Sequence, residues 1–300
     1  MVAAHVRALI ELPAAPVSTD EADRFCRMLA RSHYENFTVL SRLAPREMRR
    51  HLAALYAYCR TVDDLGDEAP GDRLALLDRF ESELDAAFSS RARHPVLVAL
   101  QETIARFDLP RDPFARLIEA NRIDQRAASF ETFADVLQYC AHSANPVGRL
   151  VLMLYGYRDE ERFARSDDTC TALQLANFWQ DVRRDAEAGR VYLPVDEMTG
   201  YGVSPSELRS AGRASANLKD LMRLQVDRAR SYFRRGLPLL DTVKGHLRID
   251  LALFSLGGLA ILRKIEQLDY DTLSHRPTLS GPEKVALGLS ALVSQRWRRI

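Results

Sequence analysis

The chain has little net charge and few cysteines, and both shortages exclude classes of protein. Its 42 basic and 41 acidic side chains leave a formal net charge of +1, so no overall positive field favours nucleic acid as a partner. Its four cysteines include no CxxC pair and its histidines form no ligand-spaced pair, so neither a zinc site nor a thioredoxin-type redox site is expected. Cysteines this sparse are typical of a reduced, cytoplasmic protein.

The sequence also lacks a long apolar run and a secretory signal. The apolar stretch LALFSLGGLAIL, residues 251–262, is too short to span a bilayer and predicts a core helix. Near the N-terminus, Arg7 and Glu11 interrupt the apolar run that a signal peptide would need. We therefore expect a cytoplasmic protein whose contact with the cell membrane is peripheral and at the inner face.

Strand-like alternation is almost absent, while helical periodicity runs through nearly the whole chain. Apolar side chains recur at three- and four-residue steps, for example in residues 46–68 and 169–189. Segments rich in Pro and Gly separate these stretches, and Ser204 followed by Glu207 is typical of a helix capping box. We predict an all-α domain over residues 25–300, preceded by an N-terminal arm over residues 1–24.

The stretch YCRTVDDLGDE, residues 58–68, crowds four carboxylates onto one helix end. Asp63 and Asp67 are four residues apart, as are Asp64 and Glu68, so each pair shares a helical face at about 5–6 Å. Such pairs repel each other unless a cation lies between them, and Mg²⁺ prefers carboxylate oxygens completed by water and phosphate. A solvated helix end is the alternative, although acidic residues oppose the helix dipole there.

A second run, QLANFWQDVRRD at residues 174–185, places oxygen-bearing side chains on one helical face. Gln174, Asn177, Asp181 and Asp185 follow one another at steps of three, four and four residues. The alternative is a surface stripe in which the two neighbouring arginines pair with the acids. Two such faces on separate helices of an all-α protein predict the facing walls of a cavity that holds metal ions and a diphosphate.

A diphosphate also needs fixed positive charge, and one arginine accompanies each motif. Arg60 lies three residues before Asp63 on the same side of the helix, and Arg190 follows Asp185 by five residues. Ordinary ion pairing with the nearby acids is the alternative for both arginines. We expect Arg60 to serve the diphosphate more than its acidic neighbours.

Together these motifs resemble those of the squalene/phytoene synthase family, the head-to-head trans-prenyltransferases. YAYCRTVDDLGD matches the first aspartate-rich motif of the family, and LQLANFWQDVRRDAEAGRVYLP matches the second. YCAHSANPVGRLVLMLYG corresponds to the helix that lines the prenyl pocket, and LRKIEQLDYDTLSHRP corresponds to the C-terminal helix and tail. The resemblance covers residues 25–295 and implies a single-domain isoprenoid synthase fold with a central active-site cavity.

The resemblance also assigns roles to individual residues. It implies three magnesium ions bound with the diphosphate, held by Asp63, Asp67, Asn177, Asp181 and Asp185, with Asp64 as a helper. It implies substrate contacts from Tyr56, Arg60, Gln174, Arg190 and Tyr192. The segment RSHYENF corresponds to a Ser-rich signature that touches diphosphate, of which Ser32 remains, with Tyr34 as a new polar neighbour. Arg276 matches a basic C-terminal position for which His275 is an equal candidate. Whether Asp64 and Glu68 bind metal, act indirectly or are solvated stays open.

Three shorter segments point to one branch of the family. HYENF, SANPVGRLVL and ANFWQDV resemble the hydroxysqualene synthases of bacterial hopanoid biosynthesis. Those enzymes take presqualene diphosphate from a sister enzyme and release hydroxysqualene, which a third enzyme reduces to squalene. The resemblance therefore implies functional links to a presqualene diphosphate synthase and to a squalene-forming reductase. No NADPH is expected, because water and not hydride captures the cation.

Water capture requires one placed water molecule in an otherwise dry tunnel. The segment HSANP supplies Ser143 and Asn145, and we hypothesise that one or the other positions that water, while Tyr139 faces the cation. The alternative is that these polar side chains satisfy backbone groups near Pro146.

Two further hypotheses remain from the sequence. The first is another head-to-head condensation on the same fold, by a presqualene diphosphate, phytoene or dehydrosqualene synthase. The second is a non-catalytic relative that acts as an assembly factor, and the five intact ligand positions argue against it.

Overall fold

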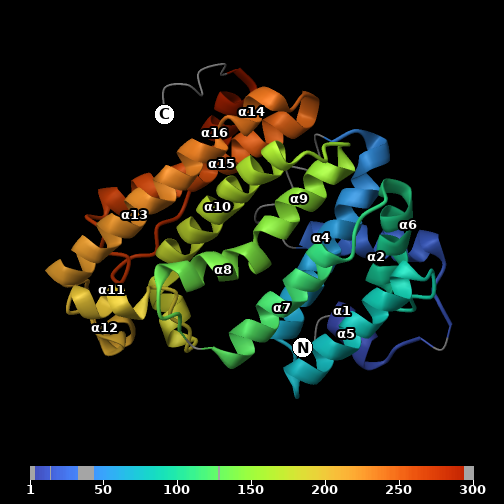
Figure 1. Ribbon diagram of the computed structural model, residues 1–300, viewed down its shortest axis with the longest axis horizontal. Helices are drawn as coiled ribbons and strands as arrows, with labels where there is room; N and C mark the ends of the chain where they lie inside the picture. Colours follow the sequence, from blue (N-terminus) through green and yellow to red (C-terminus); the bar gives the residue numbers. More distant parts are fainter. Residues whose placement is uncertain (1–3, 14, 33–43, 128, 294–300) are drawn as a thin grey trace. The chain divides into compact units, whose positions relative to one another are not determined.

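Figure 1 shows the computed structural model of the chain, which describes residues 4–13, 15–32, 44–127 and 129–293. The chain divides into two compact units. Unit 1 holds residues 1–126 and 149–158, and unit 2 holds residues 127–148 and 159–300. Among the described residues every regular element is a helix, apart from one isolated β-bridge between Ser129 and Val191. The all-α prediction is therefore confirmed.

Unit 1 is organised around α4. Its complete helices are α1 (Ala4–Ile10), α2 (Thr19–Ser32), α4 (Arg46–Asp67), α5 (Arg73–Phe88), α6 (Pro95–Phe107) and α7 (Asp112–Arg126). The buried stripe of α4 follows steps of three and four residues and includes Leu52, Leu55, Val62 and Leu65. Tyr58 belongs to the same stripe, and its hydroxyl donates to the carbonyl of Phe114 at 2.8 Å, which ties α4 to α7.

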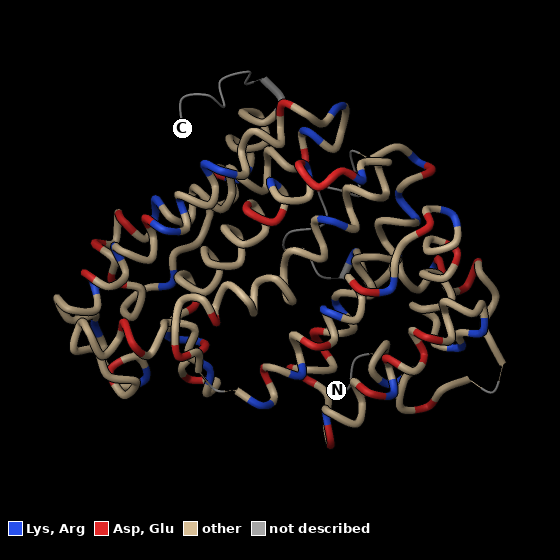
Figure 2. Tube along the Cα trace, in the orientation of Figure 1, with Lys and Arg blue, Asp and Glu red and all other residues tan. Residues whose placement is uncertain are grey.

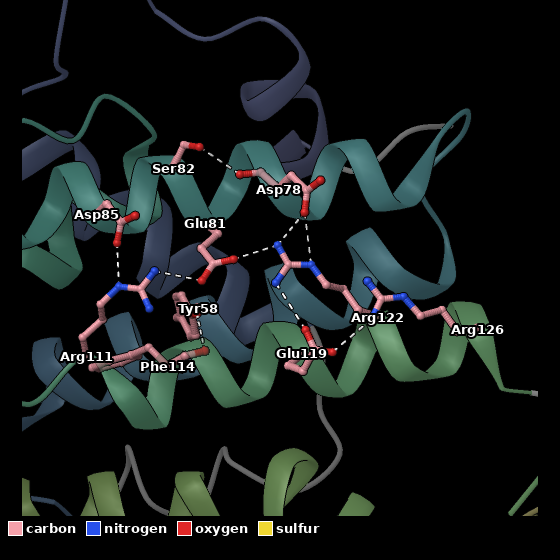
Figure 3. Close-up of polar contacts among 10 residues, drawn as sticks. All are labelled: Tyr58, Asp78, Glu81, Ser82, Asp85, Arg111, Phe114, Glu119, Arg122 and Arg126. Atoms are coloured by element: carbon pink, nitrogen blue, oxygen red, sulfur yellow. Dashed lines mark hydrogen bonds and ion pairs between the residues drawn. The ribbon is translucent and has the colours of Figure 1, made fainter.

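Ion pairs join α5 to α7 (Figure 3). The Glu81 carboxylate accepts from Arg111 at 2.8 Å and from Arg122 at 2.7 Å. The same two arginines also pair with aspartates of α5, since Arg111 donates to Asp85 and Arg122 donates to Asp78. Single exposed pairs contribute little, but a connected network fixes how the two helices lie along each other.

The segment predicted as an N-terminal arm contains α1 and the first part of α2. α1 packs against α4, α5 and α6, and it buries His5, Val6 and Leu9. The boundary predicted between residues 24 and 25 falls inside α2. The first residues of the chain therefore contribute to the packing of unit 1.

Unit 2 is organised around α10. Its complete helices are α8 (Phe133–Ser143), α10 (Glu160–Glu187), α11 (Val195–Gly200), α12 (Pro205–Ser210), α13 (Ala216–Gly236), α14 (Leu239–Thr242), α15 (Gly245–Gln267) and α16 (Gly281–Val293). A further helix, α9 (Asn145–Leu154), begins in unit 2 and ends in unit 1. α10 starts at Asp159, whose carboxylate caps the backbone N–H of Arg162 at 3.0 Å. It packs against α8, α12, α13, α14 and α15.

Of two local predictions for unit 2, one is confirmed and the other is confirmed in part. The Ser204 hydroxyl caps α12 by accepting from the backbone N–H of Glu207 at 3.2 Å, but the Glu207 carboxylate accepts from the backbone N–H of Ser215 at 3.0 Å instead of completing a capping box. The apolar stretch at residues 251–262 is part of α15, which extends beyond it at both ends. α15 is long and apolar enough to span a membrane, but core helices share that composition, and α15 packs against α10, α13 and α16.

One glycine lets α13 approach α10 closely. A Cβ atom on Gly236 would lie 2.2 Å from Thr169 Oγ1 and 2.9 Å from the Thr169 backbone nitrogen. Because the backbone atom cannot move aside like a side chain, any larger residue here must separate the two helices.

We therefore expect Gly236→Ala to destabilise unit 2 by about 1–3 kcal/mol, the usual cost of overpacking. Urea unfolding of the variant measures this loss. Gly288→Ala is the matched control, because nothing lies near its added methyl group and alanine favours a helix. Equal stability of the two variants would contradict the account of the α10–α13 contact.

Candidate active site

The two predicted motifs lie near the C-terminal ends of two long helices, one in each unit. α4 carries Asp63, Asp64 and Asp67 in its last turns. α10 carries Gln174, Asn177, Asp181 and Asp185 along its C-terminal half. Both motifs lie on helices, as the sequence predicts, so Asp63 and Asp67 share one face of α4, and the four α10 residues share one face of that helix.

The acidic residues of α4 separate into accessible and buried ones. Asp63 and Asp67 are exposed, whereas Asp64 is only 2% exposed. Although Asp63 retains accessible surface, desolvation by the surrounding protein raises its pKa to about 7, and the neighbouring Asp67 carboxylate adds to the shift. A hydrogen bond from Asn121 and the charge of Arg60 act in the opposite direction. The crowding that the sequence predicts is therefore concentrated on the Asp63–Asp67 pair.

Both carboxylate oxygens of Asp64 are already engaged. Oδ2 contacts Nε2 of His5, which is also 2% exposed, and Oδ1 pairs with the Arg60 guanidinium. Arg60 reaches Glu68 as well, at 3.2 Å. Arg60 thus contacts two of its acidic neighbours, and the expectation that it serves the diphosphate more than these acids stays a prediction. Its Nε atom is buried without a hydrogen-bond partner among the described residues, so the guanidinium keeps one donor for an anion.

His5 is a site residue that the sequence did not reveal, because it lies 59 positions from Asp64. Its backbone carbonyl accepts from Nε2 of the buried His94 at 2.9 Å. The Glu83 carboxylate in turn accepts from the backbone N–H of His94 at 3.1 Å. α1 is thus pinned to the start of α6, and this holds His5 against Asp64.

The second motif has an arginine on its central carboxylate. Arg276 pairs with Asp181 in bidentate fashion, with Nε to Oδ1 at 2.6 Å and Nη2 to Oδ2 at 2.8 Å. The tail that carries Arg276 is held on α10, because Arg183 donates to the carbonyl of Leu273 at 2.8 Å. The other basic candidate, His275, has its ring nitrogen 3.1 Å from the Ser274 hydroxyl. Of the two, Arg276 is the residue that the structure brings to the motif.

Two of the predicted residues belong to one aromatic cluster in unit 2. Tyr192 stacks on Phe178 with 3.8 Å between ring centroids, and Tyr139 lies 5.6 Å from Tyr192 and 5.2 Å from Phe130. Tyr192 and Phe178 also line a narrow pocket of about 10 Å³ together with Asp185. Phe130 and Phe178 were not predicted, since lone aromatics in helical segments look like ordinary core. The cluster offers aromatic faces, which attract cations.

The two candidates for positioning water differ in their contacts. The Oδ1 atom of Asn145 accepts from the Thr171 hydroxyl at 3.0 Å, which ties the start of α9 to α10. The Ser143 hydroxyl is buried at the end of α8 and has no hydrogen-bond partner among the described residues. A buried hydroxyl without a partner is unusual and is commonly satisfied by water.

The remaining predicted residues are less informative. Ser32 is the last residue of α2, and Tyr34 lies outside the described residues. Tyr56 on α4 is half-buried, and burial raises its pKa. Arg190 follows α10, where its backbone N–H donates to the carbonyl of Asp185 at 2.8 Å. Gln174 is half-buried on α10.

The donor set fits magnesium only with help from a ligand. Within the described parts of the chain, no three His, Cys, Asp or Glu side chains gather closely enough to hold a metal ion by themselves. Each motif instead offers one or two accessible carboxylates, and Mg²⁺ typically combines that number with phosphate oxygens and water. The raised pKa of Asp63 reflects desolvation together with repulsion from Asp67, and a nearby cation would reduce that repulsion.

Comparisons with known proteins agree with these motifs. The family model described as squalene/phytoene synthase matches residues 30–283. The phytoene synthase of Mycobacterium tuberculosis (strain ATCC 25618 / H37Rv) is 32% identical over 282 residues, which cover 92% of this chain and 92% of that protein. The phytoene synthase of Arthrospira platensis is 28% identical over 276 residues, with coverage of 87% and 89%.

Solved structures are similar over the same length. The crystal structure of squalene synthase HpnC from Alicyclobacillus acidocaldarius has 47% identity and a TM-score of 0.80, and the match covers 88% of this chain and 98% of that one. A dehydrosqualene synthase in complex with ligand has 23% identity and a TM-score of 0.83, over 91% of this chain and 96% of that one. The latter likeness concerns the fold alone.

The buried histidine that pins α1 generates a prediction about pH. Burial lowers the pKa of His94 to about 4, so the unfolded chain takes up a proton first as the pH falls. Stability is therefore fully present above about pH 6.5 and is lost as the pH falls towards 4, by up to about 3 kcal/mol from this residue. His94→Gln, which keeps a donor for the His5 carbonyl, should flatten the pH dependence of urea unfolding in this window. His275→Gln is the control at an exposed site, and an unchanged slope in His94→Gln would contradict the assignment.

Proposed function

Because the chain belongs to the squalene/phytoene synthase family, we propose that it is a hydroxysqualene synthase, which converts presqualene diphosphate and water to hydroxysqualene and diphosphate. The family and the predicted isoprenoid synthase fold are confirmed by the family model and the solved structures. Enzymes of this family act on prenyl diphosphates, and the specific reaction is the part that we propose.

The proposal rests on the chain's higher sequence identity to one solved squalene synthase than to phytoene and dehydrosqualene synthases. The chain is 47% identical to a protein described as squalene synthase HpnC, but 32% identical to the phytoene synthase of Mycobacterium tuberculosis and 23% identical to a dehydrosqualene synthase. The segments HYENF, SANPVGRLVL and ANFWQDV resemble hydroxysqualene synthases in the same direction. The hopanoid pathway and the links to a presqualene diphosphate synthase and a squalene-forming reductase follow from this proposal.

In the proposed mechanism the acidic motifs and the arginines handle the diphosphate. Asp63, Asp67, Asn177, Asp181 and Asp185 would hold magnesium ions, three in number by the resemblance. When bound, magnesium supplies the positive charge that stabilises the diphosphate as a leaving group. Arg60 and Arg190 bind and orient the diphosphate oxygens through charge-assisted hydrogen bonds. We propose that Asp64 is not a ligand, since its two oxygens hold His5 and Arg60, and that it fixes the direction of Arg60.

The rest of the mechanism concerns the cation that remains. The C–O bond to the diphosphate breaks and its electron pair leaves with the diphosphate, so that a cyclopropylcarbinyl cation forms and rearranges to an allylic one. The aromatic faces of Tyr139 and its neighbours stabilise this positive charge and exclude bulk water. One water held by Ser143 then attacks the cation through an oxygen lone pair, and the resulting oxonium gives up a proton to the released diphosphate to leave the alcohol. No hydride donor enters this sequence, so the proposal requires no NADPH.

A second candidate function is a head-to-head condensation. The curated relatives of the chain include phytoene synthases at 28–32% identity, and they favour a presqualene diphosphate, phytoene or dehydrosqualene synthase. A non-catalytic assembly factor is disfavoured, because all five predicted ligand positions keep oxygen-bearing side chains.

We propose that the protein works in the cytoplasm with peripheral contact to the cell membrane. Presqualene diphosphate and hydroxysqualene are long apolar molecules that partition into lipid. An enzyme that takes one and releases the other benefits from residence at the membrane surface.

Product identification tests the proposed reaction. The protein is incubated with magnesium and either presqualene diphosphate or farnesyl diphosphate, and the products are identified by mass spectrometry. The proposal predicts hydroxysqualene from presqualene diphosphate and no turnover of farnesyl diphosphate. Turnover of farnesyl diphosphate alone would instead support the condensation.

The two polar residues of the HSANP segment give a matched pair of variants. Ser143→Ala should lower the yield of hydroxysqualene by about fivefold to tenfold, which corresponds to the loss of one hydrogen bond to the attacking water. Asn145→Ala should instead lower stability by about 1 kcal/mol through the lost Thr171 contact and leave the product unchanged. An unchanged yield in Ser143→Ala would remove the water role from this residue.

A further inference from the structure

α13 and α15 form an open groove that is basic at its rim and apolar at its floor. The groove encloses about 570 Å³, including its open mouth. Its floor is made by Phe233, Leu237 and Leu259, and its rim by Arg230, Arg234 and Arg263. All of these residues belong to unit 2, and Figure 2 shows the basic positions recurring along the helix labelled α13 in Figure 1. The groove has no part in the proposed chemistry.

Two of the three arginines have no acidic partner. Arg230 pairs with Glu266. Among the described residues, no carboxylate lies within ion-pair distance of Arg234 or Arg263. Their sequence neighbours are neutralised, since Arg235 pairs with Asp168 at 3.0 Å and Lys264 pairs with Glu283 at 2.9 Å. Among the described residues the charges of Arg234 and Arg263 therefore lack an ion-pair partner, and an anion with several oxygens would accept hydrogen bonds from these guanidinium groups.

The neighbouring helix α16 exposes apolar surface. Val285 and Leu289 lie one turn apart and are 64% and 59% exposed, which makes them the two most exposed large apolar side chains among the described residues. Ala291, on another face of α16, is buried in an apolar cluster. Leu237 packs against that cluster and also lines the groove, so α16 and the groove adjoin.

We propose that α13, α15 and α16 form a docking surface for an anionic membrane. In this arrangement the arginine groove holds the phosphate of a lipid headgroup, and Val285 and Leu289 enter the interfacial region of the bilayer. The surface deepens the peripheral membrane contact of the proposed function and rests on that part of it. It does not depend on which prenyl diphosphate the enzyme uses.

Three observations favour lipid over other occupants. The apolar floor directly beneath the arginines suits a phosphate attached to an acyl chain, whereas a free phosphate would leave the floor in water. Transfer of the exposed apolar side chains Val285 and Leu289 from water into a bilayer would stabilise the bound state. The residues that follow α16 include Arg296, Trp297, Arg298 and Arg299. Their positive charge does not suit a groove that is itself basic. Basic and aromatic residues together are typical of segments at a membrane surface.

Vesicle flotation tests the docking surface. The full chain is mixed with vesicles of phosphatidylcholine alone or with added phosphatidylglycerol, at low and at high salt. Wild-type protein should bind the phosphatidylglycerol vesicles and release at high salt. Each groove arginine near an anionic surface contributes about fivefold in affinity, so Arg234→Gln with Arg263→Gln should weaken binding about 25-fold. Val285→Ser with Leu289→Ser should weaken binding without a change in charge.

The matched control removes two arginines from another part of unit 2. Arg209→Gln with Arg213→Gln alters the net charge equally at exposed positions outside the groove, and binding should stay within about twofold of wild type. An equal loss in this control, or no binding of wild type to phosphatidylglycerol vesicles, would overturn the proposal. Binding of inorganic phosphate at the groove arginines without vesicle binding would also overturn it, in favour of a free phosphate ligand.

Turnover separates this proposal from the proposed reaction. The groove variant should turn over detergent-dispersed presqualene diphosphate at the wild-type rate, because none of the altered residues belongs to either acidic motif. Loss of turnover in that folded variant would overturn the assignment of the groove to docking alone. If wild type binds vesicles through the groove but converts no presqualene diphosphate, the proposed reaction fails and the docking surface stands.

Discussion

The packing of unit 1 must accommodate the repulsion among the carboxylates at the end of α4. Four acidic side chains lie within two turns, and the fold treats them differently. Asp64 is buried in contact with His5 and Arg60, while Asp63 and Asp67 remain accessible. The contact of His94 with the His5 carbonyl holds α1 so that His5 reaches Asp64. The hydrogen bond from Tyr58 to the Phe114 carbonyl holds α4 against α7. The packing of unit 1 thus leaves one carboxylate pair available to a cation from outside.

The same balance occurs on α10. Asp181 shares both oxygens with Arg276, whose tail is held by hydrogen bonds to α10 itself. In each motif a guanidinium neutralises one carboxylate, and the other acids keep accessible or half-buried positions. The Arg276–Asp181 pair is partly exposed and contributes little, so Asp181 can exchange Arg276 for a stronger cation, whereas the buried Asp64 keeps its contact with Arg60. Both motifs are therefore suited to metal ions that arrive together with a diphosphate.

Much of the fold could be predicted from the sequence, because helical periodicity and capping residues are local signals. The steps along α4 and α10, the cap at Ser204 and the core helix around residues 251–262 all depend on neighbours a few positions away. The burial of Asp64 could not be predicted, since its spacing equals that of its accessible neighbours. His5, Phe130 and Phe178 were missed because their contacts come from distant segments. The different contacts of Ser143 and Asn145 could not be predicted either, because Asn145 accepts a hydrogen bond from Thr171, a residue distant in the sequence, and Ser143 does not.

We propose that magnesium binds together with the diphosphate at the accessible acids and not at Asp64. Titration calorimetry of magnesium into the protein, with and without inorganic diphosphate, measures this directly. The account predicts tight magnesium binding only when diphosphate is present, its loss in Asp63→Asn and in Asp181→Asn, and its survival in Asp64→Asn with weaker affinity for diphosphate. Tight binding without diphosphate, or complete loss of magnesium binding in a folded Asp64→Asn variant, would contradict it.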